Sequence, residues 1–172
     1  MLLIIVLVVL PFGLAAIIGA PYLPIMRRDY EPILDLANLK PGQTILDLGS
    51  GDGRFLLAAA RRGYRAIGYE INPFLYVISR LLTWRYRSLV TIHLANFWPA
   101  DLPPVDAIYV FLIDRLMPKL DTKLTKEIAK PTPVISFVFK IPGRKPQVQT
   151  RNAYLYWYPP LASKPQPAYH KQ

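Results

Sequence analysis

The chain has 172 residues, 52% of them hydrophobic, and carries 21 Lys and Arg against 11 Asp and Glu, for a formal net charge of +10. This hydrophobic content excludes an intrinsically disordered chain. With no cysteine and only two histidines, His93 and His170, the sequence excludes disulfides and a cysteine nucleophile and predicts no metal site. No charged residue precedes Arg27, and the 146 residues that follow residue 26 (172 minus 26) have the length of one domain.

The first 20 residues, MLLIIVLVVLPFGLAAIIGA, include 17 apolar side chains. As a helix this segment spans about 30 Å, the thickness of the hydrocarbon core of a bilayer, so residues 1–20 are predicted to be a transmembrane anchor. The first charges, Arg27 and Arg28, favour a cytoplasmic (or matrix) location for the rest of the chain. A cleaved signal peptide and a buried soluble helix are the alternatives.

Strand and helix patterns alternate along the remainder of the chain. Residues 21–40 form a linker and a short helix that Asp29 is expected to cap, and residues 41–158 form the main domain. The expected strands are 44–48, 65–70, 89–95, 106–113, 133–140 and 152–158, and the expected helices are 53–62, 73–86 and one from about 115 to 130. Residues 159–172 are a basic, Pro-rich tail. This order predicts an α/β fold with a Rossmann-like, doubly wound, mostly parallel sheet.

A glycine-rich turn, Asp47-Leu48-Gly49-Ser50-Gly51-Asp52-Gly53, follows the first predicted strand. Its glycines permit a tight turn, and we expect it and the next helix to offer bare backbone N–H groups to an anionic ligand group. Glu70 ends the second predicted strand, 19 residues after Gly51, where an acid binds the hydroxyls of an adenosine ribose. The turn and this acid together predict an adenosine-containing cofactor.

The glycine spacing distinguishes between cofactors. A nicotinamide fingerprint needs a third glycine where this chain has Arg54. The pattern Gly49-x-Gly51-x-Gly53 after Asp47 instead resembles motif I of the class I S-adenosylmethionine-dependent methyltransferases. The resemblance implies that Asp47 lies near the methionine amino end, that the backbone of Gly49, Ser50, Gly51 and Gly53 borders the amino-acid portion, that Glu70 holds the ribose, and that Ile71 packs on the adenine.

The third predicted strand runs into Asn96-Phe97-Trp98, where enzymes of this class present an acid or amide to the adenine amine. Asn96 can accept that hydrogen bond, and Phe97 adjoins the same cofactor region. The alternative is that Asn96 caps a turn while Phe97 and Trp98 belong to the core.

A longer resemblance extends over nearly the whole domain. The apolar span, Ala20-Pro21-Tyr22-Leu23-Pro24 and DLGSGDGRFLLAAARRGYRAIGYEINPFL are similar to the membrane-anchored lysine methyltransferases of the ATP synthase c-subunit and the adenine nucleotide translocase. That resemblance implies a minimal seven-strand class I methyltransferase fold and a lysine of a membrane protein as substrate. The chain departs from the family at Asn96, where Asp is usual, and lacks an acid near the end of its last strand.

A lysine nucleophile must lose its proton, which a desolvated, aromatic-lined pocket favours. The candidates for catalytic wall residues are Tyr22, Tyr30, Trp98 and Asp114. Tyr22 is alternatively an interfacial aromatic residue, Trp98 a core residue, and Asp114 the cap of a helix beginning near Arg115.

Residues 128–172 contain seven Lys and Arg and no Asp or Glu, interleaved with aromatic residues. Such a region suits an anionic membrane surface, RNA, or a merely soluble face. The function expected from the sequence is that of a membrane-anchored protein-lysine methyltransferase. A methyltransferase of RNA or of a small hydrophobic or lipid substrate, and a non-catalytic module that binds an adenosine ligand, are the alternatives.

Overall fold

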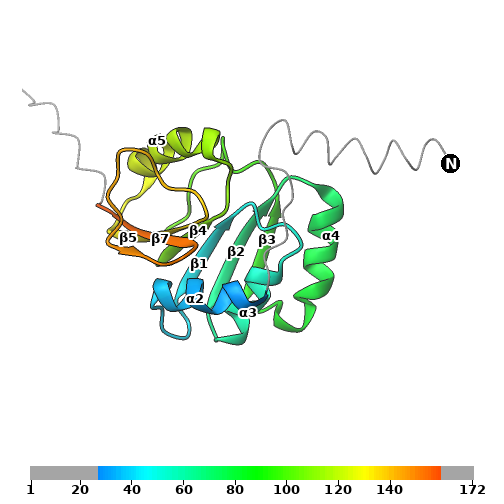
Figure 1. Ribbon diagram of the computed structural model, residues 1–172. Coiled ribbons are helices and arrows are strands. Elements are labelled where there is room, and N and C mark those ends of the chain that lie inside the picture. Colours follow the sequence, from blue (N-terminus) through cyan, green and yellow to red (C-terminus); the bar gives the residue numbers. More distant parts are fainter. Residues whose placement is uncertain (1–26, 160–172) are drawn as a thin grey trace, which may run out of the picture.

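Seven strands form one sheet in the computed structural model, which describes residues 27–159 (Figure 1). The strand order is β3-β2-β1-β4-β5-β7-β6, and β1 to β5 are parallel, whereas β7 runs antiparallel to both β5 and β6. The strands are β1 Thr44–Leu48, β2 Arg65–Glu70, β3 Val90–Leu94, β4 Ala107–Val110, β5 Thr132–Phe137, β6 Val148–Gln149 and β7 Ala153–Tyr158. The predicted mostly parallel α/β sheet is therefore confirmed.

The helices cover the two faces of the sheet unequally. They are α2 Arg27–Ala37, α3 Arg54–Arg61, α4 Pro73–Leu82 and α5 Met117–Glu127, with short 3-10 turns η1 Trp84–Tyr86 and η2 Asp114–Leu116. The α2 and α3 helices pack on one face, α4 lies beside α3 at the β3 edge, and α5 packs on the opposite face (Figure 1). Each face therefore has its own hydrophobic core.

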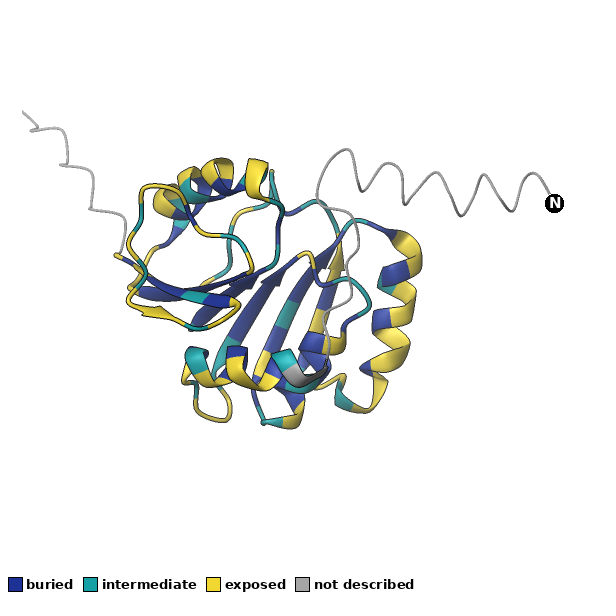
Figure 2. Cartoon of the chain, viewed as in Figure 1, coloured by how far each residue is buried: buried dark blue, intermediate teal, exposed yellow. Residues whose placement is uncertain are grey.

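The central strands are buried because both of their faces are covered. Every residue of β4 and β5 is buried, as in the dark blue centre of Figure 2. Successive side chains alternate between the cores, so that Ile45 faces α2 and α3 while Leu46 faces α5. Because the parallel strands β1 to β5 share one direction, their carboxyl ends meet at one edge, where such sheets bind ligands.

Several boundaries differ from the sequence-based expectation. The β5 strand ends at Phe137 because Val138 adopts a left-handed backbone with φ of +67°, and the Ser136 hydroxyl donates to the Phe139 carbonyl. Asp29 lies in the first turn of α2 and is not its cap, because that helix already includes Arg27. The α4 helix ends at Leu82, and the two-residue strand β6 was not predicted.

Two predicted regions fall partly or wholly beyond the described chain. The anchor at residues 1–20 lies outside residues 27–159, and so does the tail after Pro159. Between residues 27 and 159, no helix has the length and apolar character needed to cross a membrane.

Candidate functional site

The glycine-rich turn between β1 and α3 is anchored to the end of β2. The N–H groups of Gly49 and Ser50 both donate to the Tyr69 carbonyl, at 3.1 and 2.8 Å, and the Gly53 N–H donates to the Ser50 carbonyl at 3.0 Å. The Gly51 N–H donates to Oε2 of Glu70 at 2.7 Å. Four amides that we expected to be bare are thus already satisfied.

One N–H group at the start of α3, that of Arg54, is also engaged within the chain. The Asp52 carboxylate accepts a hydrogen bond from the Arg54 N–H at 3.3 Å and forms an ion pair with the Arg54 Nε at 2.6 Å. A negative charge therefore already stands where an anionic ligand group would bind a helix N-terminus. Ligand binding by the backbone N–H groups of Gly49, Ser50, Gly51 and Gly53 would therefore require these internal hydrogen bonds to be exchanged, and the expected anion-binding role of the turn stays a prediction.

The glycines of the turn serve two different purposes. Gly53 has φ of +81°, and a Cβ atom there would lie 2.7 Å from Cβ of Ser79, so its hydrogen lets α3 and α4 approach closely. Gly49 has φ of +105°, but a Cβ atom there would meet nothing within 4 Å. Gly53 is therefore required by packing, whereas Gly49 leaves open space beside the turn.

Glu70 is held in place by backbone hydrogen bonds at the carboxyl end of β2. Its side chain is buried, Oε1 accepts the Asn72 N–H at 2.7 Å, and Oε2 accepts the Gly51 N–H at 2.7 Å. Burial raises the pKa of the carboxyl group, against the lowering effect of these N–H groups. Each oxygen keeps a lone pair for a further donor, so the carboxylate can still receive a pair of hydroxyls.

Asp47 is the second buried acid of the site, with 2% of its surface exposed. Burial raises the pKa of Asp47 well above its usual range, and the charges of Glu70 and Asp52 raise it further. Three carboxylates thus gather around one turn of a chain whose formal net charge is +10. Within residues 27–159 no group of three or more His, Asp or Glu side chains is arranged to hold a metal ion.

Asn72 positions Glu70, a role that the sequence did not predict. Its Oδ1 caps α4 by accepting the N–H groups of Phe74 and Leu75, at 2.9 and 3.3 Å, while its own N–H holds Glu70. An Asn-Pro pair is typical of the start of a helix, but the hydrogen bond from the Asn72 N–H to Glu70 depends on how the chain turns after β2. Ile71, between these two residues, is half-buried.

The predicted adenine-side residues lie after β3. Oδ1 of Asn96 accepts a hydrogen bond from the Trp98 N–H at 3.0 Å, as expected if Asn96 caps a turn. The oxygen retains one lone pair, so it can still accept a hydrogen bond from an adenine amine. Phe97 is buried in the core beneath α5, with its ring centroid 4.5 Å from that of Trp98. The Trp98 ring packs on the same core, and Nζ of Lys119 lies 4.3 Å from its centroid.

The three predicted wall residues that the structure describes are not brought together. Tyr22 lies outside the described residues, and Tyr30 is buried in the α2 and α3 core, where it meets Phe55 edge-on at 6.1 Å. Trp98 packs on the opposite face of the sheet. Asp114 is exposed and begins η2, so it does not cap a helix that starts near Arg115.

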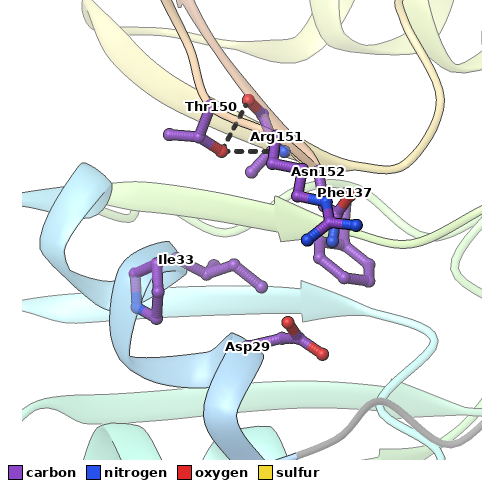
Figure 3. Close-up of a pocket in the computed structure, with 8 residues that line it drawn as sticks. Asp29, Ile33, Phe137, Thr150, Arg151 and Asn152 are labelled. Atoms are coloured by element: carbon purple, nitrogen blue, oxygen red, sulfur yellow. Dashed lines mark hydrogen bonds between the residues drawn. The ribbon is translucent and has the colours of Figure 1, made fainter.

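A cavity of about 610 Å³ opens between α2 and the ends of β5 and β7 (Figure 3). Its apolar part consists of Ile33, Phe137 and Ala153, and Asp29 contributes a carboxylate from α2 (Figure 3). Pro32, Thr150, Arg151 and Asn152 complete the lining. The cavity lies at the carboxyl end of β5, two strands from the glycine turn, which corresponds to about 10 Å across a sheet.

Tyr109 of β4 is a buried tyrosine beside Asp47. It is paired with Asp47 in the sheet register, and its ring stacks on Phe55 at 4.0 Å. Its hydroxyl is buried and has no hydrogen-bond partner among the described residues. Burial raises the pKa of Tyr109, and Asp47, Tyr30 and Asp29 raise it further, so acids of both sites act on one hydroxyl.

Comparison with known proteins gives consistent matches. The model of the ANTKMT methyltransferase domain matches residues 47–148. The ATP synthase c-subunit lysine N-methyltransferase of Xenopus laevis is 31% identical over 128 residues, which are 73% of this chain and 56% of that protein. The adenine nucleotide translocase lysine N-methyltransferase of Mus musculus is 37% identical over 129 residues, again 73% of this chain and 56% of that protein.

A solved structure is similar over almost its whole length. The RNA methyltransferase from Salinibacter ruber, crystallised in complex with S-adenosyl-L-homocysteine, superposes with a TM-score of 0.75 and 28% identity, covering 80% of this chain and 94% of that one. The chain spans little more than half the length of the curated relatives described above. The shared part contains the glycine turn, Glu70 and Asn96.

Proposed function

The chain belongs to the ANTKMT methyltransferase domain family, and from this we propose that it is an S-adenosylmethionine-dependent protein-lysine N-methyltransferase acting on a membrane protein. The observation that carries the proposal is the glycine turn itself. Its amides are engaged, its open side is at Gly49, and three carboxylates surround it. This arrangement suits a cationic adenosine compound and disfavours a phosphate-bearing one.

The residues of the turn fit S-adenosylmethionine group by group. Glu70 has the two lone pairs that the ribose hydroxyls need, and Asp47 supplies a buried carboxyl group whose ionised form the methionine ammonium group would stabilise. The open side of Gly49 provides room for the amino-acid portion. When bound, S-adenosylmethionine supplies a methyl group on a positively charged sulfur, already activated for displacement, so the protein has to align the nucleophile and exclude water.

We assign entry of the substrate lysine to the cavity between α2 and β5. The apolar side chains of Ile33, Phe137 and Ala153 suit the aliphatic stem of lysine, and the Asp29 carboxylate suits its ammonium group. The Asp29 carboxylate favours the charged ammonium group on entry, and desolvation of the stem opposes this effect and favours the neutral amine that attacks the methyl group. Asp29 is half-exposed, so the proton can leave to solvent.

The named relatives support a lysine substrate on a membrane protein. One is named for lysine methylation of the ATP synthase c-subunit and another for that of the adenine nucleotide translocase. The predicted anchor at residues 1–20 would hold the domain beside such a substrate, on the cytoplasmic or matrix side of the membrane. This location is part of the proposal.

The decisive experiment compares two glycines at opposite ends of β1. Gly49 and Gly42 have φ of +105° and +87°, and a Cβ atom at either would meet nothing within 4 Å, so valine strains the backbone at both positions. We expect Gly49→Val to abolish binding of S-adenosylmethionine in calorimetry, because its side chain fills the open space, and Gly42→Val to retain it. Equal affinities for the two variants would refute the assignment of the turn.

Substrate identity is tested by methyl transfer to membranes from cells that lack the chain. Label from S-adenosylmethionine should appear in a membrane protein and map to lysine by mass spectrometry, and Asp29→Asn should raise the KM for that protein without weakening cofactor binding. The Salinibacter relative favours RNA as a second candidate. Label that is lost after ribonuclease treatment and is not found in protein would decide for RNA.

A further inference from the structure

The outer face of α4 is an exposed apolar surface. Five side chains spaced by three or four residues lie on it, and Trp84 of η1 continues it: Phe74, Val77, Ile78, Leu81, Leu82 and Trp84. Leu81 is 70% exposed and Trp84 59%. The helix is outlined in yellow along its outer side in Figure 2. We call these six residues the α4 face.

An apolar helix face of this kind is unusual within this domain. The exposed side of α5 carries Lys119, Thr122, Thr125 and Lys126, so that helix has the polar exterior of an ordinary surface helix. Soluble monomers rarely expose contiguous apolar patches, and such patches mark protein or membrane contacts. The α4 face therefore requires a partner, and its charges indicate which kind.

The charged residues in the segment that carries the α4 face all have the same sign. Residues 73–88 contain Arg80, Arg85 and Arg87, all exposed, and no acidic residue. Arg87 lies 5.0 Å from the centroid of the Trp84 ring, and Arg80 lies 6.0 Å from that of Tyr76. Aliphatic residues with Trp and Arg at their border are the composition of a helix that lies in the interface of a bilayer.

We infer that the α4 face is a membrane-docking surface that binds anionic phospholipid. The apolar side chains enter the boundary between headgroups and acyl chains, and the arginines pair with lipid phosphates, which they can contact in a bidentate manner. This inference goes beyond the proposed methyltransferase activity and does not depend on it. It also places lipid contact on a different surface from the basic region 128–172.

Docking through α4 would fix the distance between the membrane and the glycine turn. The α4 helix begins directly after the Glu70 and Asn72 pair, and Ser79 on its inner side lies against Gly53 of the turn. The helix and the turn therefore form one packed unit. A bilayer that holds α4 also holds the site at a constant height above its surface.

The test uses the full chain and the absence of native cysteine. Leu81→Cys and Val77→Cys place a single nitroxide label on the α4 face, and Lys126→Cys places the same label on the exposed side of α5 as the matched control. Each labelled protein is studied in nanodiscs of phosphatidylcholine, with and without phosphatidylglycerol. Collision with oxygen, which concentrates in lipid, is compared with collision with a water-soluble nickel chelate.

In discs that contain phosphatidylglycerol, labels at positions 81 and 77 should collide preferentially with oxygen, and the label at position 126 with the nickel chelate. Changing Arg80, Arg85 and Arg87 together to Gln should lower the ratio of docked to undocked domain about 100-fold, since each arginine near an anionic surface contributes about fivefold. Phosphatidylcholine alone should give the same loss of docking. The thermal midpoint of the triple variant should match that of the parent chain.

Two results would overturn the inference. Nickel accessibility at position 81 equal to that at position 126 would show that α4 does not touch the bilayer. Protection at position 81 that persists in phosphatidylcholine discs and in the triple arginine variant would show that the α4 face is covered by another part of this chain or by a second copy.

Discussion

Replacing Gly53 by alanine should destabilise the fold, because this residue packs closely against Ser79 of α4. A Cβ atom at Gly53 would lie 2.7 Å from Cβ and 3.0 Å from Cα of Ser79, and φ is +81°. Overpacking of this kind costs about 1–3 kcal/mol, and a left-handed backbone costs a non-glycine residue about 1–2 kcal/mol. We therefore expect Gly53→Ala to lower the free energy of unfolding by about 3 kcal/mol, or about 6–12 °C in thermal midpoint for a chain of this length.

Two further variants separate the backbone cost from the collision. Gly143 has a similar φ of +75° but open space around a Cβ atom, so Gly143→Ala should cost only the backbone part, about 1 kcal/mol. Adding Ser79→Gly to Gly53→Ala removes the nearest atom and should restore part of the loss. Thermal and urea unfolding, followed by circular dichroism on the full chain, measure all four proteins. Equal losses for Gly53→Ala and Gly143→Ala would refute close packing of α3 on α4.

Two other predictions concern buried charges. Because burial and neighbouring acids raise the pKa of Asp47 in the folded state, stability of the cofactor-free chain should fall as the pH rises from the unfolded to the folded pKa. Asp47→Asn should remove this fall of stability with pH, raise the thermal midpoint at neutral pH and weaken the binding of S-adenosylmethionine. A variant whose thermal midpoint depends on pH as it does in the parent chain would contradict this. The buried Lys123 ammonium donates to the Ala100 carbonyl at 2.6 Å and pairs with Glu127 at 2.7 Å. Lys123→Ala should lower the free energy of unfolding by about 3 kcal/mol, as measured with urea. Lys123→Met keeps the apolar stem and should lower it distinctly less, so equal losses for the two variants would argue against packing of that stem.

The central strands of the sheet could be predicted because the sequence patterns that specify them lie within each strand and its adjoining turn. Residues 44–48 and 65–70 form strands with the predicted bounds, since each is an apolar run ended by a turn signal. The position of Glu70 beside the glycine turn follows from the parallel pairing of these two strands. The exposed, two-residue strand β6 carries no such signal.

The features that the sequence missed depend on contacts between distant segments. The cavity joins Asp29 of α2 to Asn152 at the start of β7, and no local pattern brings these residues together. The engagement of the turn amides likewise depends on where the Tyr69 carbonyl lies in the folded sheet. Glycine spacing predicted a tight turn correctly, but the direction of its N–H groups is a property of the tertiary structure.

The engaged amides and the three acids of the turn have a consequence for competition inside a cell. Adenosine is shared by many abundant metabolites, and most of them carry phosphates. The N–H groups of Gly49, Ser50, Gly51 and Gly53 already donate within the chain, and the acidic side chains around the turn disfavour a further negative charge there. With the ribose held at Glu70 as proposed, the turn would disfavour the phosphates of a nucleotide. It would then discriminate between S-adenosylmethionine and ATP, which share the adenosine group.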